Sequence, residues 1–237
     1  YLDTAVSTMD VAHSHASSPK NNGLLVLSEE QSSGRGRFAR NWISPKYQNL
    51  YLSVLLHGDA DILKYMSIAA CLAVSKAIEN LTPLTIELNW PNDLAVKGKK
   101  LGGILVEQVH SIEKLSYGVI GIGLNVNMDT SRYQEIAESA TSIQMELGRP
   151  FSRELMLVEI LEMLEHEQAM IKANISPVPE WKQKLVTLGS RITLKESAVE
   201  HTGKAVNVDE NGNLVMQLDD DSYITMASGD VTSHRSA

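Results

Sequence analysis

Residues 84–126 contain three β-rich segments joined by short connections, and this run constrains the fold more than any other part of the sequence. The segments are residues 84–90, 102–109 and 115–126. Between the first two, Lys97-Gly98-Lys99 is typical of a hairpin turn, because glycine readily adopts the positive φ that such turns require. Successive strands joined in this way predict a mixed or antiparallel sheet and an α+β fold.

The flanking sequence supplies further strands and two long helices. Residues 23–30 and 49–56 are two earlier β segments, and residues 61–81 predict a helix with Asp61 as its N-cap. Ser152 begins a long amphipathic helix, whose Glu and His residues we expect to be solvated. The apolar face of this helix, expected to pack on the sheet, consists of Leu155, Val158, Leu161 and Leu164.

A change of pattern near Gly189 predicts a domain boundary. The segment before it carries two prolines, and the segments after it are short and alternate between apolar and polar residues. Asn211-Gly212 is a strong hairpin signal, and the Asp219–Asp221 run lies where another turn is needed. We therefore predict a catalytic or ligand-binding domain over residues 1–189 and a small β-barrel over residues 190–237 that leans on it.

Charge and cysteine content exclude several classes of protein. The net charge of −8 argues against bulk nucleic-acid binding, because that affinity comes largely from Lys and Arg side chains that neutralise phosphates. The single cysteine, Cys71, lies in an apolar run, so it is expected to be a buried helix residue, and neither a disulfide framework nor a cysteine metal cluster is predicted. No secretory signal or transmembrane segment is predicted either. We expect a cytoplasmic protein with no nucleic-acid or membrane partner.

The stretch "SSGRGRFARNW", residues 32–42, is a candidate anion-binding loop. Its glycines permit a close approach of the backbone to a ligand, and Arg35, Arg37 and Arg40 supply planar, permanently charged groups suited to carboxylate or phosphate. The alternative is a solvated basic surface loop. In an acidic chain, a local basic loop favours a small anion as the ligand.

Three other motifs concentrate polar chemistry at predicted element ends. In "NWPNDLAVKGKKLGG", Asn92 and Asp93 follow a rigid proline, and Lys100 precedes two glycines; in "GIGLNVN", Asn125 follows a glycine-spaced strand. Ser7 and Thr8 lie where a helix would start and could cap it or bind a polar ligand. Each motif alone also has a structural explanation, as an Asx turn, a closely packed strand or an N-cap.

Taken together and in this order, the motifs resemble those of biotin protein ligases. The resemblance rests on "STMD", "GRGR" followed by Trp42, "WPNDL", "KLGGILVE" and "GIGLNVN", over roughly residues 5–130. It implies a class II synthetase-like catalytic domain built on a mixed β-sheet flanked by helices, followed by an SH3-like C-terminal domain. It also implies two-step chemistry: biotin and ATP, with Mg²⁺, give biotinyl-5′-AMP, and a lysine of a biotin carboxyl carrier domain then accepts the biotin. The family's DNA-binding winged helix is not part of the sequence, so the chain resembles the ligase-only type.

The resemblance also implies a biotin site. Ser7, Thr8 and Gln31 match groups that contact the ureido ring, which needs both donors and acceptors, and hydroxyl and amide groups supply both. The implied biotin-binding residues are Ser7, Thr8, Gln31, Gly34, Arg35, Lys100 and Gly103.

Positive charge is expected where the biotin carboxylate meets the α-phosphate, because these two anions repel each other. Asp93 matches a carboxylate near the metal or the incoming lysine, and no protein metal site is predicted. Several members of the family that the chain resembles carry lysine where this chain has Asn89. Lys100 or Mg²⁺ is therefore expected to neutralise a larger share of the phosphate charge. The implied catalytic residues are Lys100, Arg37, Arg35 and Asp93, and the implied ATP or adenylate residues are Arg37, Arg40, Trp42, Asn92, Lys100 and Asn125.

Two other functions stay open at this point. A lipoate or octanoate protein ligase or transferase shares the broader fold, but lipoate has no ureido group for the polar set to bind. A non-catalytic biotin-binding regulatory module would bind biotin without exchanging ATP for pyrophosphate. The sequence does not determine the carrier protein or the oligomeric state, and a homodimer is one open arrangement.

Overall fold

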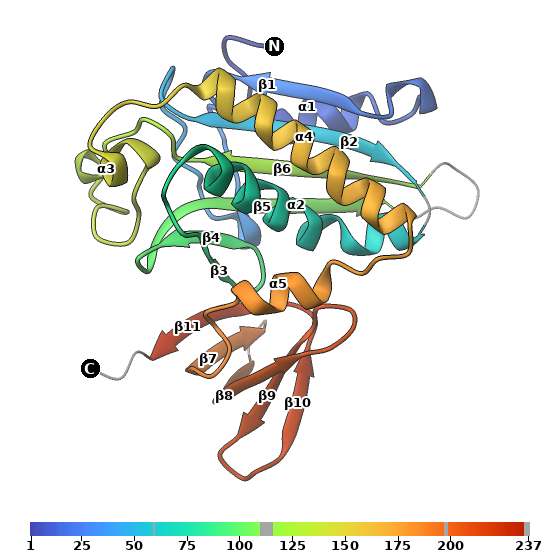
Figure 1. The fold of residues 1–237 in the computed structure, drawn as a ribbon, viewed down its shortest axis with the longest axis vertical. Helices are drawn as coiled ribbons and strands as arrows, with labels where there is room; N and C mark the ends of the chain where they lie inside the picture. Colours follow the sequence, from blue (N-terminus) through green and yellow to red (C-terminus); the bar gives the residue numbers. More distant parts are fainter. Residues whose placement is uncertain (59, 110–115, 197–198, 235–237) are drawn as a thin grey trace.

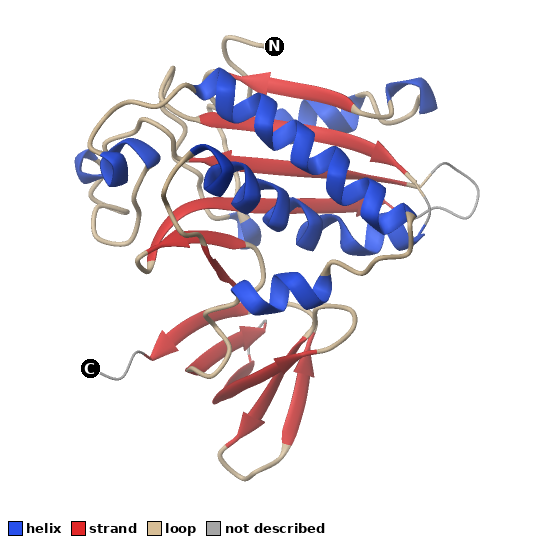
Figure 2. Ribbon diagram, in the orientation of Figure 1, coloured by secondary structure: helices blue, strands red, loops and turns tan. Residues whose placement is uncertain are grey.

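The computed structural model describes every residue except 59, 110–115, 197–198 and 235–237. Figures 1 and 2 show a larger part, in which helices cover a six-stranded sheet, and a smaller part made of five strands. The larger part contains α1 (Thr8–Ser14), β1 (Leu24–Ser28), β2 (Leu50–His57), α2 (Ala60–Leu81), β3 (Glu87–Asn89), β4 (Asp93–Val96), β5 (Lys99–Val109), β6 (Tyr117–Leu124), α3 (Ile143–Leu147), α4 (Arg153–Lys172) and α5 (Val178–Lys184). The smaller part contains β7 (Arg191–Glu196), β8 (Val199–Val208), β9 (Leu214–Leu218), β10 (Tyr223–Met226) and β11 (Asp230–His234).

The larger sheet has the strand order β1-β2-β6-β5-β4-β3, and every ladder in it is antiparallel, so it is not mixed. The predicted hairpin is confirmed between β4 and β5, where Lys97 and Gly98 have φ values of 50° and 74°. Positive φ at both central residues matches the twist of the two strands. Because such a tight turn reverses the chain, the two strands it joins run antiparallel.

Helices α1 and α2 cover opposite faces of this sheet. Alternate residues of a strand point to opposite faces, and β6 follows this rule. Val119 packs in a cluster with Met9 of α1, whereas Ile120 and Ile122 belong to the main core with α2. Helix α2 begins at Ala60, so the predicted cap Asp61 lies within its first turn, and the Asp61 side chain lies outside the described residues.

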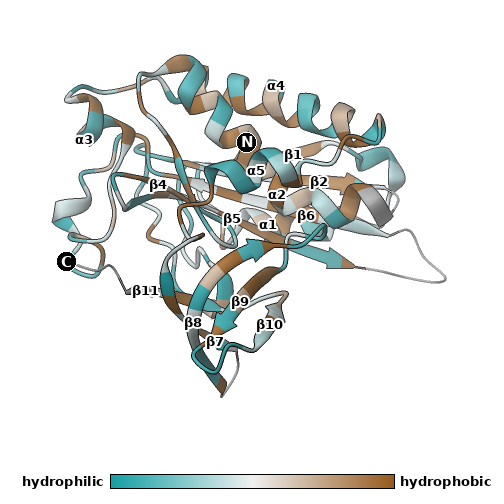
Figure 3. Cartoon of the chain, turned by 60° about the horizontal axis from the view of Figure 1, so that its bottom comes forward, coloured by the Kyte–Doolittle hydropathy of each residue, from teal (hydrophilic) through white to brown (hydrophobic). Residues whose placement is uncertain are grey.

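Helix α4 begins where the sequence predicted but buries a different face. Its N-cap is Ser152, whose side chain accepts a hydrogen bond from the backbone N–H of Leu155. Leu155 and Val158 are each 54% exposed, so the predicted apolar face is wrong at these two positions, whereas Leu161 and Leu164 pack against the core. Figure 3 shows hydrophobic and hydrophilic residues alternating along the helix, which packs against α2. The buried residues are Met156, Ile160, Glu167 and Ile171.

The buried face of α4 includes a charged residue. Glu167 was expected to be solvated, but it is buried, and its carboxylate accepts a hydrogen bond from Lys76 Nζ of α2 at 2.7 Å. Lys76 also donates to Glu180 of α5 at 2.9 Å. A buried carboxylate is tolerated only when it is paired, and here the partner comes from another helix.

The smaller part is a five-stranded antiparallel sheet in the order β10-β9-β8-β7-β11. The sequence predicted the turns at Gly212 and at Asp219–Asp221 but missed β11. This sheet shares a continuous core with the larger part, and Trp90 Nε1 donates to the carbonyl of Gly212 at 2.9 Å. The small sheet therefore leans on the larger part, as expected.

Cys71 is fully buried in α2, and burial raises the pKa of its thiol. Within the described ranges, no helix combines the length and hydrophobicity needed to cross a bilayer.

Candidate active site

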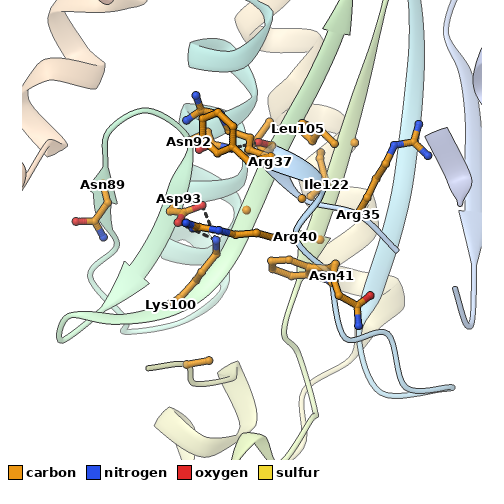
Figure 4. Close-up of a pocket in the computed structure, with 18 of the residues that line it drawn as sticks. Arg35, Arg37, Arg40, Asn41, Asn89, Asn92, Asp93, Lys100, Leu105 and Ile122 are labelled. Atoms are coloured by element: carbon orange, nitrogen blue, oxygen red, sulfur yellow. Dashed lines mark hydrogen bonds and ion pairs between the residues drawn. The ribbon is translucent and has the colours of Figure 1, made fainter. Parts of the chain in front are cut away.

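A cavity of about 620 Å³ opens beside the N-terminal end of α1 and over β5 and β6 (Figure 4). Residues 31–43 and 89–93 form further walls, and residues 229–232 of the small sheet close one side. A cavity of this size suits a small ligand or a pair of small ligands. Every residue the sequence singled out lines it except Gly34, which lies in the loop that forms one wall.

The loop over the cavity has a tight and partly strained backbone. Trp42 N donates to the carbonyl of Gly34 at 2.9 Å, and a Cβ on Gly34 would lie 2.7 Å from Ser44 Oγ. Phe38 and Ala39 both have positive φ, 56° and 55°, which side-chain-bearing residues rarely adopt. Such strain is found where the surrounding structure or a ligand holds the backbone in place.

Two facing glycines form the floor of the cavity beneath Trp42. Gly103 of β5 and Gly123 of β6 are paired in register. A Cβ on Gly123 would lie 2.5 Å from the Trp42 ring, so only glycine allows the indole to lie on the sheet. Trp42 Nε1 is buried and has no hydrogen-bond partner among the described residues. The indole N–H could therefore donate a hydrogen bond to a ligand oxygen.

Lys100 and Asp93 form an ion pair inside the cavity. Lys100 Nζ lies 2.7 Å from the Asp93 carboxylate and 5.5 Å from the centre of the Trp42 ring. The β4–β5 hairpin brings the two residues together, because Asp93 begins β4 and Lys100 lies near the start of β5. Figure 4 shows the pair pointing into the cavity, where a negatively charged ligand could compete with Asp93 for the ammonium group.

The start of α1 presents hydroxyl and amide groups to the cavity. Ser7 is the N-cap, and its hydroxyl accepts from Met9 N. Thr8 N donates to Gln31 Oε1 at 2.9 Å, and the Thr8 hydroxyl lies 2.8 Å from Ser53 Oγ. Ser7 thus caps α1, Thr8 begins it, and both residues also line the cavity.

The three arginines of the loop have different surroundings. Arg35 is directed away from Lys100 (Figure 4) and pairs with Asp10 and Glu107. Arg37 has no ion pair within the described part of the chain; burial lowers its pKa, and the nearby charge of Asp93 opposes that effect. Arg40 pairs with Asp230 of β11.

Two amide side chains near the cavity donate hydrogen bonds to backbone carbonyl groups. Asn92 Nδ2 donates to the carbonyl of Ile104. Asn125 is buried, and its Nδ2 donates to the carbonyl of Thr141 at 3.1 Å. Asn89 lies on the cavity wall, where it supplies a neutral amide group.

Sequence reasoning missed the carboxylates that surround the loop. Asp10 closes the "STMD" motif and Glu107 ends "KLGGILVE", but no local pattern indicates that both contact Arg35. Asp230 was missed because β11 itself was not predicted. In the described ranges, no group of three or more His, Cys, Asp or Glu side chains could hold a metal ion.

Comparison with known proteins places these features in a family context. Residues 2–125 match the family model described as "Biotin/lipoate A/B protein ligase family". The chain is 29% identical over 241 residues to the biotin–[acetyl-CoA-carboxylase] ligase of Mycobacterium tuberculosis, covering 98% of this chain and 87% of that protein. It is 28% identical over 225 residues to the bifunctional ligase/repressor BirA of Bacillus subtilis, covering 93% of this chain and 69% of that protein.

The likeness extends to the three-dimensional structure. The biotin protein ligase from Aquifex aeolicus in complex with biotin and ATP superposes on this chain with a TM-score of 0.82 at 27% identity. The superposition covers 99% of this chain and 97% of that chain, so it includes both sheets.

Proposed function

Since the chain belongs to the biotin/lipoate A/B protein ligase family, we propose that it is a biotin–protein ligase that joins biotin to a lysine of a biotin carboxyl carrier domain. In the first step the biotin carboxylate attacks the α-phosphate of ATP, which forms biotinyl-5′-AMP and releases pyrophosphate. In the second step the lysine amine attacks the acyl carbon, which forms the amide and releases AMP and a proton. The likeness over almost the whole chain to a ligase that binds biotin and ATP carries this proposal.

At one end of the cavity, the side chains suit the ureido group of biotin. This group offers one carbonyl acceptor and two N–H donors, and the hydroxyls of Ser7 and Thr8 and the amide of Gln31 can match both kinds. Thr8 and Gln31 already bond to each other, so their orientation is fixed before the ligand arrives. Preorganisation of this kind lowers the entropic cost of binding.

At the other end, positive charge suits the meeting of two anions. Lys100 is held by Asp93, and Arg37 is a second cation at the cavity wall. Both can reduce the repulsion between carboxylate and α-phosphate and stabilise the charge that develops on the phosphoryl oxygens. Arg40, Trp42 and Asn125 line the same cavity, and we assign them to the adenylate.

Magnesium enters this scheme as part of the ATP substrate. Mg²⁺ is usually held by one or two carboxylates together with substrate phosphates, and Asp93 with Asn92 supplies suitable oxygen ligands here. Held there, the ion would neutralise phosphate charge. If Lys100 turned to the phosphates, Asp93 would be available to hold the ion or to orient the incoming lysine.

We further propose that residues 1–189 form the catalytic domain and residues 190–237 a second domain that contributes to the same cavity. The support is the lining by residues 229–232 and the pair between Arg40 and Asp230. The carrier domain would approach the cavity from the solvent side.

Intact-mass measurement tests the proposed function. The chain is incubated with biotin, Mg-ATP and a biotin carrier domain, and the carrier should gain the mass of one biotinyl group. A parallel reaction with lipoate and a lipoyl domain should show no gain, whereas the reverse result would assign a lipoate ligase. Biotin binding without pyrophosphate exchange would instead indicate a regulatory module.

A further inference from the structure

Arg35 is clamped between two carboxylates that lie on different elements. Its Nη1 lies 2.7 Å from Asp10 Oδ1, and its Nε and Nη2 lie 3.4 Å from the two oxygens of Glu107. Both edges of the guanidinium are therefore occupied. Partial burial lowers the pKa of Arg35, but the hydrogen bonds to Asp10 and Glu107 outweigh it, and the pKa lies above its ordinary value.

The arrangement of Arg35 contrasts with that of the two cations assigned to the reaction. Arg37 has no ion pair in the described ranges, and Lys100 is paired with one carboxylate inside the cavity. For Arg35 to reach a phosphate, it would have to leave two carboxylates at once. Its side chain is also directed away from Lys100 (Figure 4).

The partners of Arg35 are themselves fixed to the walls of the cavity. Asp10 lies in the first turn of α1, the helix that carries Thr8. Glu107 lies on β5, the strand that carries Gly103. Glu107 also bonds to His13 Nε2 at 2.8 Å. Arg35 thus ties the loop to two walls of the cavity at the same time.

We infer that Asp10 and Glu107 are positioning residues, which use Arg35 to clamp the loop over residues 32–40 onto α1 and β5, and that Arg35 does not contact the reacting phosphate. This inference rests on the proposed function, because the clamp shapes the biotin end of the cavity. It replaces the catalytic role that the sequence suggested for Arg35 and leaves the charge-stabilising role to Lys100 and Arg37.

Charge-neutral variants test the clamp. The set is Asp10→Asn, Glu107→Gln and the double variant, with Asp219→Asn as a matched control that removes a carboxylate from the exposed Arg191 pair of the small sheet. Two readouts are needed: KM and kcat for biotin in pyrophosphate exchange, and trypsin cleavage within residues 32–40 without ligands. Each pair is partly exposed, so each single variant should raise KM and cleavage about two- to fivefold, and the double variant about tenfold.

Arg35→Ala completes the test. It should raise KM as the double variant does and leave kcat within about threefold, and adding Asp10→Asn to it should change nothing further, because the shared interaction is already lost. A fall of kcat by about 100-fold in Arg35→Ala would overturn the inference, as would wild-type KM and cleavage in the double variant. Absence of exchange in the unaltered chain would refute the proposed function instead, and the cleavage measurement would still report on the clamp.

Discussion

Replacing Lys100 with alanine should slow adenylate formation by about 10² to 10³, because Asp93 holds the Lys100 ammonium group inside the cavity. Two unit charges about 4 Å apart at an effective dielectric constant of about 20 interact by about 4 kcal/mol. The Lys100 side chain is 40% exposed, so water screens part of this attraction. A loss of about 3–4 kcal/mol of transition-state stabilisation follows, in the range found when one preorganised charge-stabilising group is removed.

The assay is biotin-dependent exchange of labelled pyrophosphate into ATP. Lys97→Ala is a matched control: Lys97 lies in the same hairpin, is 79% exposed and pairs with Glu146 at 3.0 Å, outside the cavity. It should retain wild-type exchange, and thermal unfolding should show that both variants are folded. If exchange by Lys100→Ala stays within about threefold of wild type, the electrostatic role assigned to Lys100 is wrong.

Three further predictions concern other parts of the molecule. Arg37→Gly removes a charged contact to the adenylate phosphate that is worth about 1.5–3 kcal/mol, so the adenylate should dissociate faster. The released adenylate should label serum albumin that is added as a bystander protein. Unchanged labelling with intact adenylate synthesis would contradict a role of Arg37 in retaining the adenylate. Gly123→Ala forces a Cβ to within 2.5 Å of the Trp42 ring, and such overpacking costs about 1–3 kcal/mol. Titration calorimetry should then show that the affinity for a non-hydrolysable biotinyl-adenylate analogue is reduced at least about fivefold, and unchanged affinity would contradict the close packing of the indole on the strand. Glu167→Ala leaves the ammonium of Lys76 with one carboxylate, so urea unfolding should show a loss of about 2–3 kcal/mol while exchange stays normal, and a loss below about 0.5 kcal/mol would contradict a stabilising pair.

Local sequence signals were sufficient for most strands, for the turns and for the start of α4, but not for β11. The β4–β5 hairpin follows from Gly98, the turn between β8 and β9 follows from Gly212, and the start of α4 follows from its cap Ser152. Each of these features depends on backbone conformations or hydrogen bonds within a few residues of the chain. The residues that line the cavity could also be named from the sequence. They lie in short motifs, and these motifs together resemble those of one ligase family.

The pairing of the charged residues became visible only in the three-dimensional fold. Glu167 was expected to be solvated, but the fold buries it against Lys76 of α2, and it leaves Leu155 and Val158 exposed. The sequence suggested an anion-binding role for Arg35, and the fold adds that α1 and β5 bring two carboxylates to it. Charge interactions act through space between groups far apart in the chain, so the sequence determined which residues surround the cavity, and the fold determined which of them are free to meet a ligand.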